Sequence, residues 1–307
     1  MDVAGQVSVL FLLMLTGFIS AKLKVIGPEM AEHSSAFIMN VSLPAMLLSS
    51  FQRPFSRELL GEAGAALFIS ALIYGFSFLL AYFYPRLLRI QGPERGVHRY
   101  GVIFSNCGFI GYPMVEAILG PAYVFHAVIF NIPFSFLAYS IGAWLVSKEG
   151  ERALAVSWKT FANPSVIATF IGFLLFICSA TLPGPVYRSV KMIGDITSPL
   201  SMIVIGITLA QAKPGQVFGR WRIYVTVAMR LAILPALAAM ACYAFGIRGP
   251  LLMLAVLITA MPCGSSTSIM ASLYRSAPEE AGSLVFLSTV LCMFTIPAVV
   301  LAVRALS

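Results

Sequence analysis

The sequence predicts an all-α polytopic membrane protein, and three observations support this fold class. Hydrophobic residues make up 59% of the 307 positions and charged residues only 10%, whereas soluble domains carry about 25% charged residues. The mean hydropathy is +0.92. The apolar runs continue over roughly 20 residues, which is the length a membrane-spanning helix needs. A β-barrel would instead show short segments of alternating polarity.

Hydropathy indicates ten spanning helices. Their approximate ranges are 4–21, 34–51, 62–84, 98–119, 122–146, 164–181, 189–210, 220–245, 250–273 and 281–304. Lys22 and Lys24 follow the first range instead of preceding it. We therefore interpret that range as a retained span and not as a cleaved signal peptide.

The basic residues predict the orientation of the chain. Thirteen of them lie on one side, at Lys22, Lys24, Arg86, Arg89, Arg95, Arg99, Lys148, Arg152, Lys159, Lys213, Arg220, Arg222 and Arg275. Six lie on the other side, at Arg53, Arg57, Arg188, Lys191, Arg248 and Arg304. Because Lys and Arg gather on the cytoplasmic side, both termini are expected outside, in the periplasm of a bacterium.

Several functions are excluded by the same composition. The net charge of +8 comes from loops between apolar segments, so the expected environment is a lipid bilayer and nucleic acid is not a partner. The five cysteines all fall inside apolar segments and give no disulfide framework. We find no His-Glu-x-x-His or Gly-x-Ser-x-Gly motif, so an enzyme is not expected. No metal or organic cofactor is implied.

Two of the predicted spans are interrupted by residues that break helices. The first interruption runs from Asn106 through Gly108 and Gly111 to Pro113, and the second runs from Met261 to Ser268. Pro removes a backbone donor and Gly loosens a helix. Broken helix is tolerated in hydrocarbon only where it is buried or lines a cavity. Two such segments at corresponding places in two halves indicate the substrate site of a secondary transporter.

The prolines also indicate an internal repeat. Spans two, four and five contain Pro44, Pro113 and Pro133, and spans seven, nine and ten contain Pro199, Pro262 and Pro297. Five spans in each half is an odd number, so the halves enter the membrane from opposite sides. We therefore expect inverted repeats at 1–146 and 164–307, joined by a cytoplasmic loop at 147–163. Coincidence is the alternative, since proline is common in membrane helices.

Over essentially its whole length the chain resembles the auxin efflux carrier family, in its compact bacterial form. The most specific match is the Asn-x-Gly-Phe-x-Gly-x-Pro run at 106–113. The motifs at 40–44, 163–164, 198–200 and 206–209 also fit. Plant auxin carriers have a long central loop, and this chain has none, so regulation by phosphorylation of that loop is not expected.

The resemblance implies the architecture shared with cation/proton antiporters and bile-acid carriers. Spans four and nine then cross at their prolines. Spans three to five and eight to ten move as a transport domain, in an elevator manner, against a scaffold of spans one, two, six and seven. Bacterial relatives are associated with small carboxylates such as malate or malonate, which makes auxin itself a doubtful substrate.

Two groups of residues are candidates for binding an anion. Asn106 offers a donor and an acceptor beside a broken helix, or else only joins neighbouring helices. In span nine, helix N-terminal N–H groups carry partial positive charge, and Ser is a favoured cap. The candidates there are Pro262, Gly264, Ser265, Ser266 and Ser268. The alternative for these small residues is helix packing.

Asn40 and Pro44 would lie in the scaffold and close one wall of the site, or Pro44 only kinks its helix. Four ionisable residues inside or near apolar spans are candidates for coupling or charge pairing: Glu116, Asp195, Arg230 and His126. Charges within a membrane usually face a cavity or a partner. Glu116 is either a proton-coupling carboxylate or interfacial. Arg230 either neutralises the substrate or pairs with Glu116.

The sequence thus predicts a secondary transporter of a small organic anion in a bacterial inner membrane. A Na⁺- or H⁺-coupled cation antiporter or bile-acid-type symporter is the alternative, but an antiporter would be expected to show a carboxylate pair at the crossing. The sequence leaves open the coupling ion, H⁺ or Na⁺, and whether the chain forms a homodimer.

Overall fold

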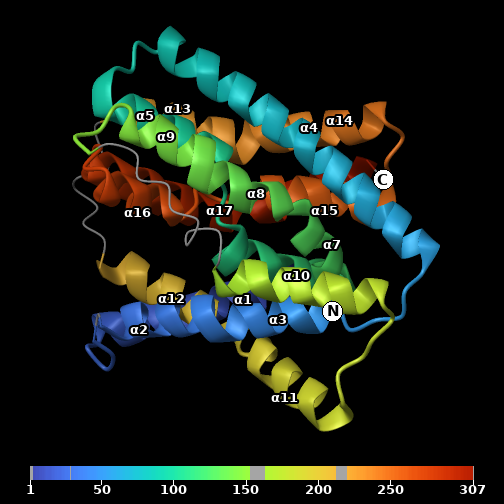
Figure 1. Cartoon of the computed structure of the whole chain (residues 1–307). Helices are drawn as coiled ribbons and strands as arrows, with labels where there is room; N and C mark the ends of the chain where they lie inside the picture. The colour runs from blue at the N-terminus through green and yellow to red at the C-terminus, as the bar shows by residue number, and fades with distance from the viewer. Residues whose placement is uncertain (1–2, 28, 153–162, 212–219, 307) are drawn as a thin grey trace. The chain divides into compact units, whose positions relative to one another are not determined.

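The computed structural model describes residues 3–27, 29–152, 163–211 and 220–306, and the regular secondary structure of this part of the chain is helical (Figure 1). Its only strand-like pairing is an isolated antiparallel bridge between Ser105 and Cys263. The all-α prediction is therefore confirmed for the described residues. The loop expected at 147–163 is described only at its ends, and 153–162 lie outside the described residues.

Helices occupy every range that hydropathy indicates. In the first half these are α1 (Val3–Lys22), α2 (Glu29–Phe37), η1 (Ile38–Ser42), α3 (Leu43–Ser50), α4 (Arg57–Leu87), α5 (Gly92–Ile103), η2 (Cys107–Gly111), α6 (Tyr112–Leu119), η3 (Pro121–Tyr123), α7 (Val124–Phe130), α8 (Ile132–Leu137), η4 (Ala138–Gly142) and α9 (Ala143–Ser147). The second half contains α10 (Pro164–Ile177), α11 (Gly184–Asp195), α12 (Thr197–Gln211), α13 (Trp221–Ala228), η7 (Met229–Ile233), α14 (Leu234–Ala244), α15 (Gly249–Thr259), α16 (Ser266–Leu273) and α17 (Pro278–Leu306).

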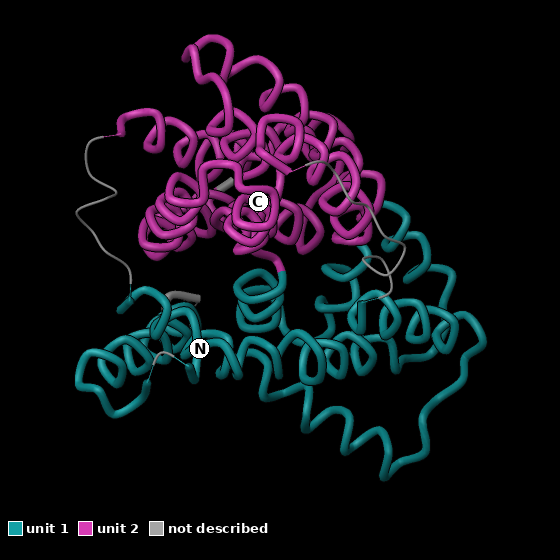
Figure 2. The backbone as a smooth tube through the Cα atoms, turned by 60° about the vertical axis from the view of Figure 1, so that its left-hand side comes forward, with its two compact units in different colours: residues 1–65, 108–129, 158–212 teal, residues 66–107, 130–157, 213–307 magenta. Residues whose placement is uncertain are grey.

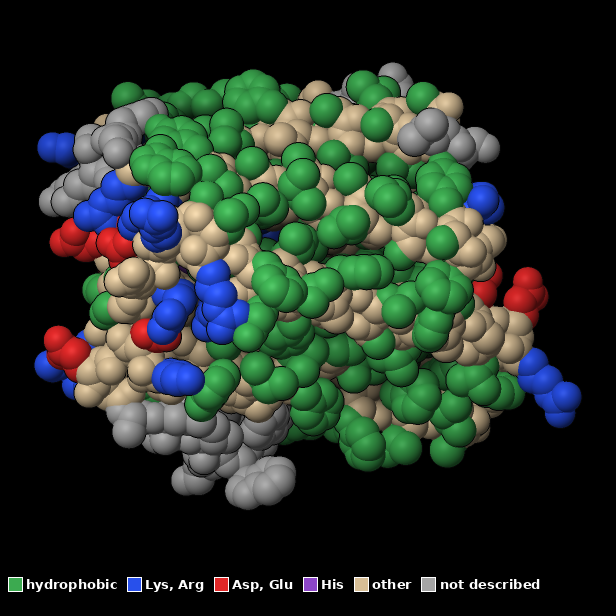
Figure 3. Space-filling model, turned by 90° about the horizontal axis from the view of Figure 1, so that it is seen from above, with side chains coloured by type: hydrophobic (Ala, Val, Ile, Leu, Met, Phe, Trp, Pro, Cys, Tyr) green, Lys and Arg blue, Asp and Glu red, His purple; other side chains and the backbone are tan. Residues whose placement is uncertain are grey.

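Among the described residues, six helical stretches are long and apolar enough to cross a membrane. They are Gly5–Lys22, Arg57–Leu87, Pro121–Ser147, Gly184–Gln211, Trp221–Ala244 and Pro278–Ala305. Three shorter apolar helices are Cys107–Leu119, Pro164–Ile177 and Gly249–Thr259. Hydrophobic side chains are spread widely over the face shown in Figure 3, and charged side chains gather toward its left and right edges. Large apolar side chains such as Leu12, Phe170 and Phe294 are more than half exposed, as expected for helices whose outer faces contact lipid.

The chain divides into two compact units (Figure 2). Unit 1 comprises residues 1–65, 108–129 and 158–212, and unit 2 comprises residues 66–107, 130–157 and 213–307. Each unit draws on both of the halves that the prolines indicate. The segment expected as span four is divided between them, since its α5 part belongs to unit 2 and its α6 part to unit 1.

Unit 1 is held together by close helix packing through glycine. A Cβ atom on Gly206 of α12 would lie 1.9 Å from the carbonyl oxygen of Met14, and one on Gly17 of α1 would lie 2.1 Å from that of Ile203. No side chain fits at either position. Small residues at such contacts let backbones approach, which is how membrane helices associate when apolar burial alone gives little driving force.

The core of unit 2 is built on aromatic side chains around α5. Tyr100 and Phe104 are fully buried, with ring centroids 4.5 Å apart, and Phe134 packs edge-on against Phe104 at 5.7 Å. Such aromatic pairs contribute about 0.5–1.5 kcal/mol beyond the burial of their area. This core fixes α5 just before the point at which its helix ends.

Candidate functional site

The first interruption lies a little earlier than the proline suggests. Helix α5 ends at Ile103, and Phe104 is extended at φ −107° and ψ 113°. The chain becomes helical again at Cys107, and Pro113 occupies the second position of α6. The break is therefore formed by residues 104–106, and Pro113 lies within the helix that follows it.

The second interruption lies between α15 and α16, over residues 260–265. Pro262 and Gly264 fall within it, and Ser265 is the residue that precedes α16. Ser266 and Ser268 lie in the first turn of α16 and are half-buried.

Within unit 2 the two interruptions pair with each other as short antiparallel segments. The backbone N–H of Asn106 donates to the carbonyl of Pro262 at 2.9 Å, and that of Gly264 donates to the carbonyl of Phe104 at 2.9 Å. These bonds satisfy backbone groups that each helix gives up at its break, which buried backbone requires. A Cβ atom on Gly264 would lie 3.1 Å from the carbonyl oxygen of Ser105, so the pairing depends on glycine there.

The side chain of Asn106 also reaches across to the second break. Its Nδ2 donates to the hydroxyl of Ser265 at 3.3 Å, and the residue is 6% exposed. A serine on α17 supports the same segment, because the backbone N–H of Cys263 donates to Ser288 Oγ at 3.1 Å. The structure thus brings together Asn106, Pro262, Gly264 and Ser265.

Some backbone donors that the sequence suggests are free have partners. The N–H groups of Thr267 and Ser268 donate to the carbonyls of Gly264 and Ser265 at 2.9 and 3.1 Å. Fewer donors are therefore left for an anion at this terminus than a bare helix end provides.

Arg230 supplies a buried positive charge beside the paired breaks. The residue lies in η7 and is 2% exposed. Its Nε donates to the carbonyl of Met261 at 2.9 Å, and its Nη1 donates to Val102 and Ile103 carbonyls at 2.9 and 3.4 Å. These carbonyls lie at or just beyond the C-terminal ends of α15 and α5, where helix dipoles favour cations. Arg230 therefore joins the ends of both broken helices.

The other sequence-predicted residues belong to unit 1. Gly108 and Gly111 lie in η2, where a Cβ on Gly108 would contact Leu43 at 3.6 Å. Asn40 is exposed in η1, and its amide donates to the carbonyl of Ala36 at 2.8 Å. Pro44 is the second residue of α3.

The charged candidates of unit 1 each have a partner. Glu116 accepts a hydrogen bond from the hydroxyl of Ser198. Asp195 pairs with Lys191 at 2.8 Å, and His126 Nε2 lies 2.8 Å from a carboxylate oxygen of Glu62. A cavity of about 280 Å³ in this unit is lined by Glu116 and Asp195, among others. The pairing of Glu116 with Arg230 would join residues of different units and stays a prediction.

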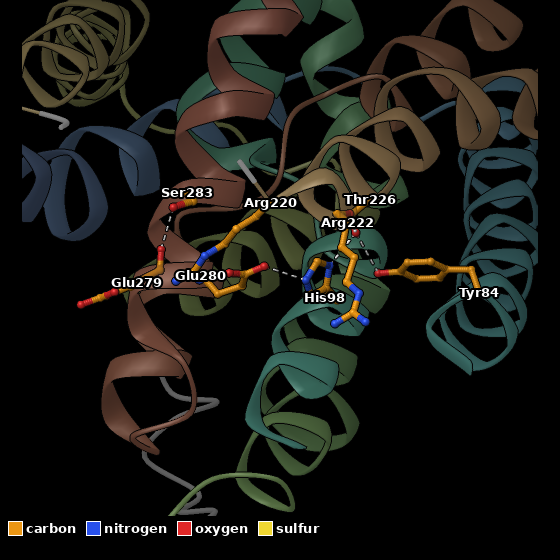
Figure 4. Close-up of polar contacts among 8 residues, drawn as sticks. All are labelled: Tyr84, His98, Arg220, Arg222, Thr226, Glu279, Glu280 and Ser283. Atoms are coloured by element: carbon orange, nitrogen blue, oxygen red, sulfur yellow. Dashed lines mark hydrogen bonds and ion pairs between the residues drawn. The ribbon is translucent and has the colours of Figure 1, made fainter. Parts of the chain in front are cut away.

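One polar cluster of unit 2 was not predicted from the sequence (Figure 4). His98 of α5 is fully buried, its Nε2 is 3.0 Å from a carboxylate oxygen of Glu280, and its Nδ1 is 2.5 Å from the hydroxyl of Thr226. Arg220 binds the other carboxylate oxygen of Glu280. The sequence does place a histidine and an acidic residue at the starts of two apolar segments. Because 182 residues separate them, nothing in the sequence indicates that they are in contact.

Comparison of the sequence with known proteins places the chain in a family. A family model described as "Membrane transport protein" matches residues 2–300. The chain therefore belongs to this family of membrane transport proteins, which includes the auxin efflux carriers. The family and the relatives below are transporters and not enzymes.

Three relatives illustrate the range of the family. An "Uncharacterized transporter" of Methanothermobacter thermautotrophicus is 25% identical, with 93% of each chain covered. A Rhizobium meliloti protein named "Putative malonate transporter" is 22% identical over 99% of this chain and 97% of its own. "Auxin efflux carrier component 1" of Arabidopsis thaliana is 25% identical over 145 residues, which are 46% of this chain and 23% of that protein.

Proposed function

We propose that the chain is a secondary active transporter that moves a small organic anion, a carboxylate of the malonate or malate kind, by alternating access with an elevator-like movement. Membership of the family supports transport, and the name of the Rhizobium meliloti relative favours a dicarboxylate. Membrane embedding in a bacterial inner membrane, with no cofactor beyond a coupling ion, completes the proposal. A homodimer is compatible with it but is not needed for it.

The proposed architecture is ten spans in two inverted repeats, with both termini outside and the two broken segments crossing. Helices in all ten expected ranges support the span count. The paired interruptions support a crossing, because two chain segments that exchange backbone hydrogen bonds must approach closely where their helices stop.

The observation that carries the proposal is the assembly of Asn106, Ser265 and Arg230 at the paired breaks. The side-chain amide of Asn106 can donate to a carboxylate oxygen in place of Ser265. Neither side chain takes part in the backbone hydrogen bonds of a helix, so the exchange breaks none of them. The buried guanidinium of Arg230 adds a positive field that is poorly screened in a low-dielectric region. An anion gains from both groups, whereas a cation would be repelled by Arg230.

The remaining candidates are proposed as secondary contributors. Gly108, Gly111 and Pro113 would shape the substrate side of the first broken segment. Ser266 and Ser268 would supply hydroxyl donors, and Asn40 with Pro44 would close one wall. Glu116, Asp195 and His126 would adjust the charge of unit 1.

Counterflow in proteoliposomes tests this function. Vesicles loaded with unlabelled malonate should take up external [¹⁴C]malonate through the purified protein, and Asn106→Ala should abolish this exchange. The matched control is Thr208→Ala, an exposed position of α12 whose hydroxyl bonds only its own helix at Val204, and it should exchange like wild type. Malonate exchange by a correctly inserted Asn106→Ala protein would contradict the proposed binding site.

A further inference from the structure

The buried pair of His98 and Glu280 has a role that the anion site does not explain. Both side chains are almost completely inaccessible, at 0% and 2% of their reference areas. Burying an ionisable pair among apolar helices is costly unless its hydrogen bonds are complete. Nothing in the proposed anion site uses these two residues.

The hydrogen bonds around His98 are complete in two different protonation states. In the first state, the Thr226 hydroxyl donates to the carbonyl of Arg222, which is 3.0 Å away. The Thr226 hydroxyl oxygen then accepts a hydrogen bond from Nδ1–H of His98. A second ring proton, on Nε2, is donated to the Glu280 carboxylate. In this state His98 is an imidazolium.

In the second state, the Thr226 hydroxyl turns and donates to Nδ1 of His98, which lies 2.5 Å away. The neutral imidazole then keeps its single proton on Nε2 and donates it to Glu280 at 3.0 Å. A proton can therefore enter or leave the ring while both ring nitrogens keep a hydrogen-bond partner, and only the Thr226 bond to Arg222 is given up. A purely structural histidine would need only one of these arrangements.

The surrounding charges define what one proton changes. Arg220 and Glu280 form an ion pair, so together with His98 the cluster carries net charge 0 or +1. Arg220 stays charged, as arginine does in proteins. Tyr84 is 3.4 Å from the Thr226 oxygen on the far side of the cluster, and Glu279 points away (Figure 4). The other charged groups on the elements around α5 are Glu94, Arg95 with its partner Glu149, Arg99, Arg222 and Arg230.

The cluster is also connected to the paired breaks of unit 2 through three elements. Helix α5 carries His98 and ends just before Asn106. Thr226 lies one helical turn before Arg230, which binds both broken ends. Helix α17 carries Glu280 and, two turns later, Ser288, which accepts from the N–H of Cys263. A change in charge at the cluster thus acts on the same helices that hold the candidate anion site.

We propose that the His98–Glu280 pair is the site at which this transporter binds one proton together with its anion. The side chain of Arg220 is 45% exposed, so the cluster borders water at its Arg220 end. The two states differ by the proton on Nδ1 of His98, which water supplies and receives, with no other reactant needed. This inference rests on the proposed transport function, because it names the coupling ion of that transport.

Direct titration tests the site without any substrate. In protein labelled with ¹³C-histidine, the His98 signal is assigned by its loss in His98→Gln. Its chemical shift should change with pH in the wild type and respond differently in Glu280→Gln, because the two side chains are in direct contact. A His98 signal that does not change with pH, or one that responds identically in Glu280→Gln, would overturn the proposal.

Transport then tests the coupling. With the membrane potential clamped at zero, a pH gradient should drive wild-type [¹⁴C]malonate accumulation by up to about tenfold per pH unit at one proton per anion. His98→Gln should keep malonate counterflow but lose this accumulation, while His33→Gln, at an exposed position of α2, should accumulate malonate like wild type. Gradient-driven accumulation by His98→Gln, or wild-type counterflow that ignores the gradient, would contradict the coupling role. If the His98 signal of the wild type responds to pH but the protein shows no malonate counterflow, the proposed substrate class is wrong and the proton site is not contradicted.

Discussion

The backbone N–H of Asn106 donates to the carbonyl of Pro262, across 2.9 Å and between two helices that both stop there. This bond makes the two interruptions of unit 2 a single paired structure. It explains how backbone groups freed by two helix breaks are satisfied without water. It also places the side chain of Asn106 beside Ser265.

Gly264→Ala should separate the paired breaks. The new methyl group would lie 2.9 Å from Ser266 Oγ and 3.1 Å from the carbonyl oxygen of Ser105. We expect a loss of about 1–3 kcal/mol in stability, as for other overpacked sites, together with loss of malonate counterflow. Thermal unfolding in detergent and counterflow measure the two effects.

Gly282→Ala is the matched control for that substitution. A methyl group there meets nothing within 4 Å in helix α17, and Ala is favoured over Gly within a helix by up to about 1 kcal/mol. Its thermal midpoint should equal or exceed that of the wild type. A Gly264→Ala protein as stable and active as Gly282→Ala would show that the close approach is not required.

Arg230→Gln should destabilise unit 2. The guanidinium donates to the carbonyls of Met261, Val102 and Ile103, and a glutamine cannot reach all of them. Each buried carbonyl left unpaired costs about 1–3 kcal/mol, so a total loss of about 3 kcal/mol or more is expected from denaturant titration. Arg275→Gln, whose side chain is 62% exposed, should change stability by less than about 1 kcal/mol. Equal midpoints for the two variants would contradict the bridging role of Arg230.

Much of this fold can be predicted from the sequence, because hydropathy and helix-breaking residues are local signals. Helices lie in each of the ten apolar ranges, six helical stretches of the described residues are long and apolar enough to cross a membrane, and both interruptions are present. The exact site of the first break does not follow from Pro113, since proline fits the start of a helix well. The chain stops being helical at Phe104, which carries no sequence signal for a break.

The partners in the site are less predictable, because they depend on contacts between distant residues. The sequence indicates that Arg230 needs a partner, but no local signal shows that backbone carbonyls at the ends of two broken helices accept its hydrogen bonds. The His98–Glu280 pair was missed for the same reason. Its two members lie near the ends of apolar segments, where an ionisable residue needs no special explanation.

The predicted orientation can be tested by thiol labelling. The exposed Cys178 is first replaced by Ser, and a single cysteine is then introduced at Arg248 or at Arg275. A membrane-impermeant maleimide added to intact cells should label Arg248→Cys and not Arg275→Cys, because the basic-rich side is cytoplasmic. The reverse pattern would invert the assignment of both termini.

The most direct test of the central claim is thermal stabilisation of the detergent-purified protein by a panel of mono- and dicarboxylates, with Na⁺ and pH varied. A ligand that binds the folded protein at 100 times its Kd adds about 2.7 kcal/mol of stability. We predict that one class of carboxylate stabilises the wild type and that Asn106→Ala loses this effect while keeping its unliganded midpoint. Stabilisation by Na⁺ alone, with every carboxylate silent, would contradict an anion site at the paired breaks and favour a cation carrier.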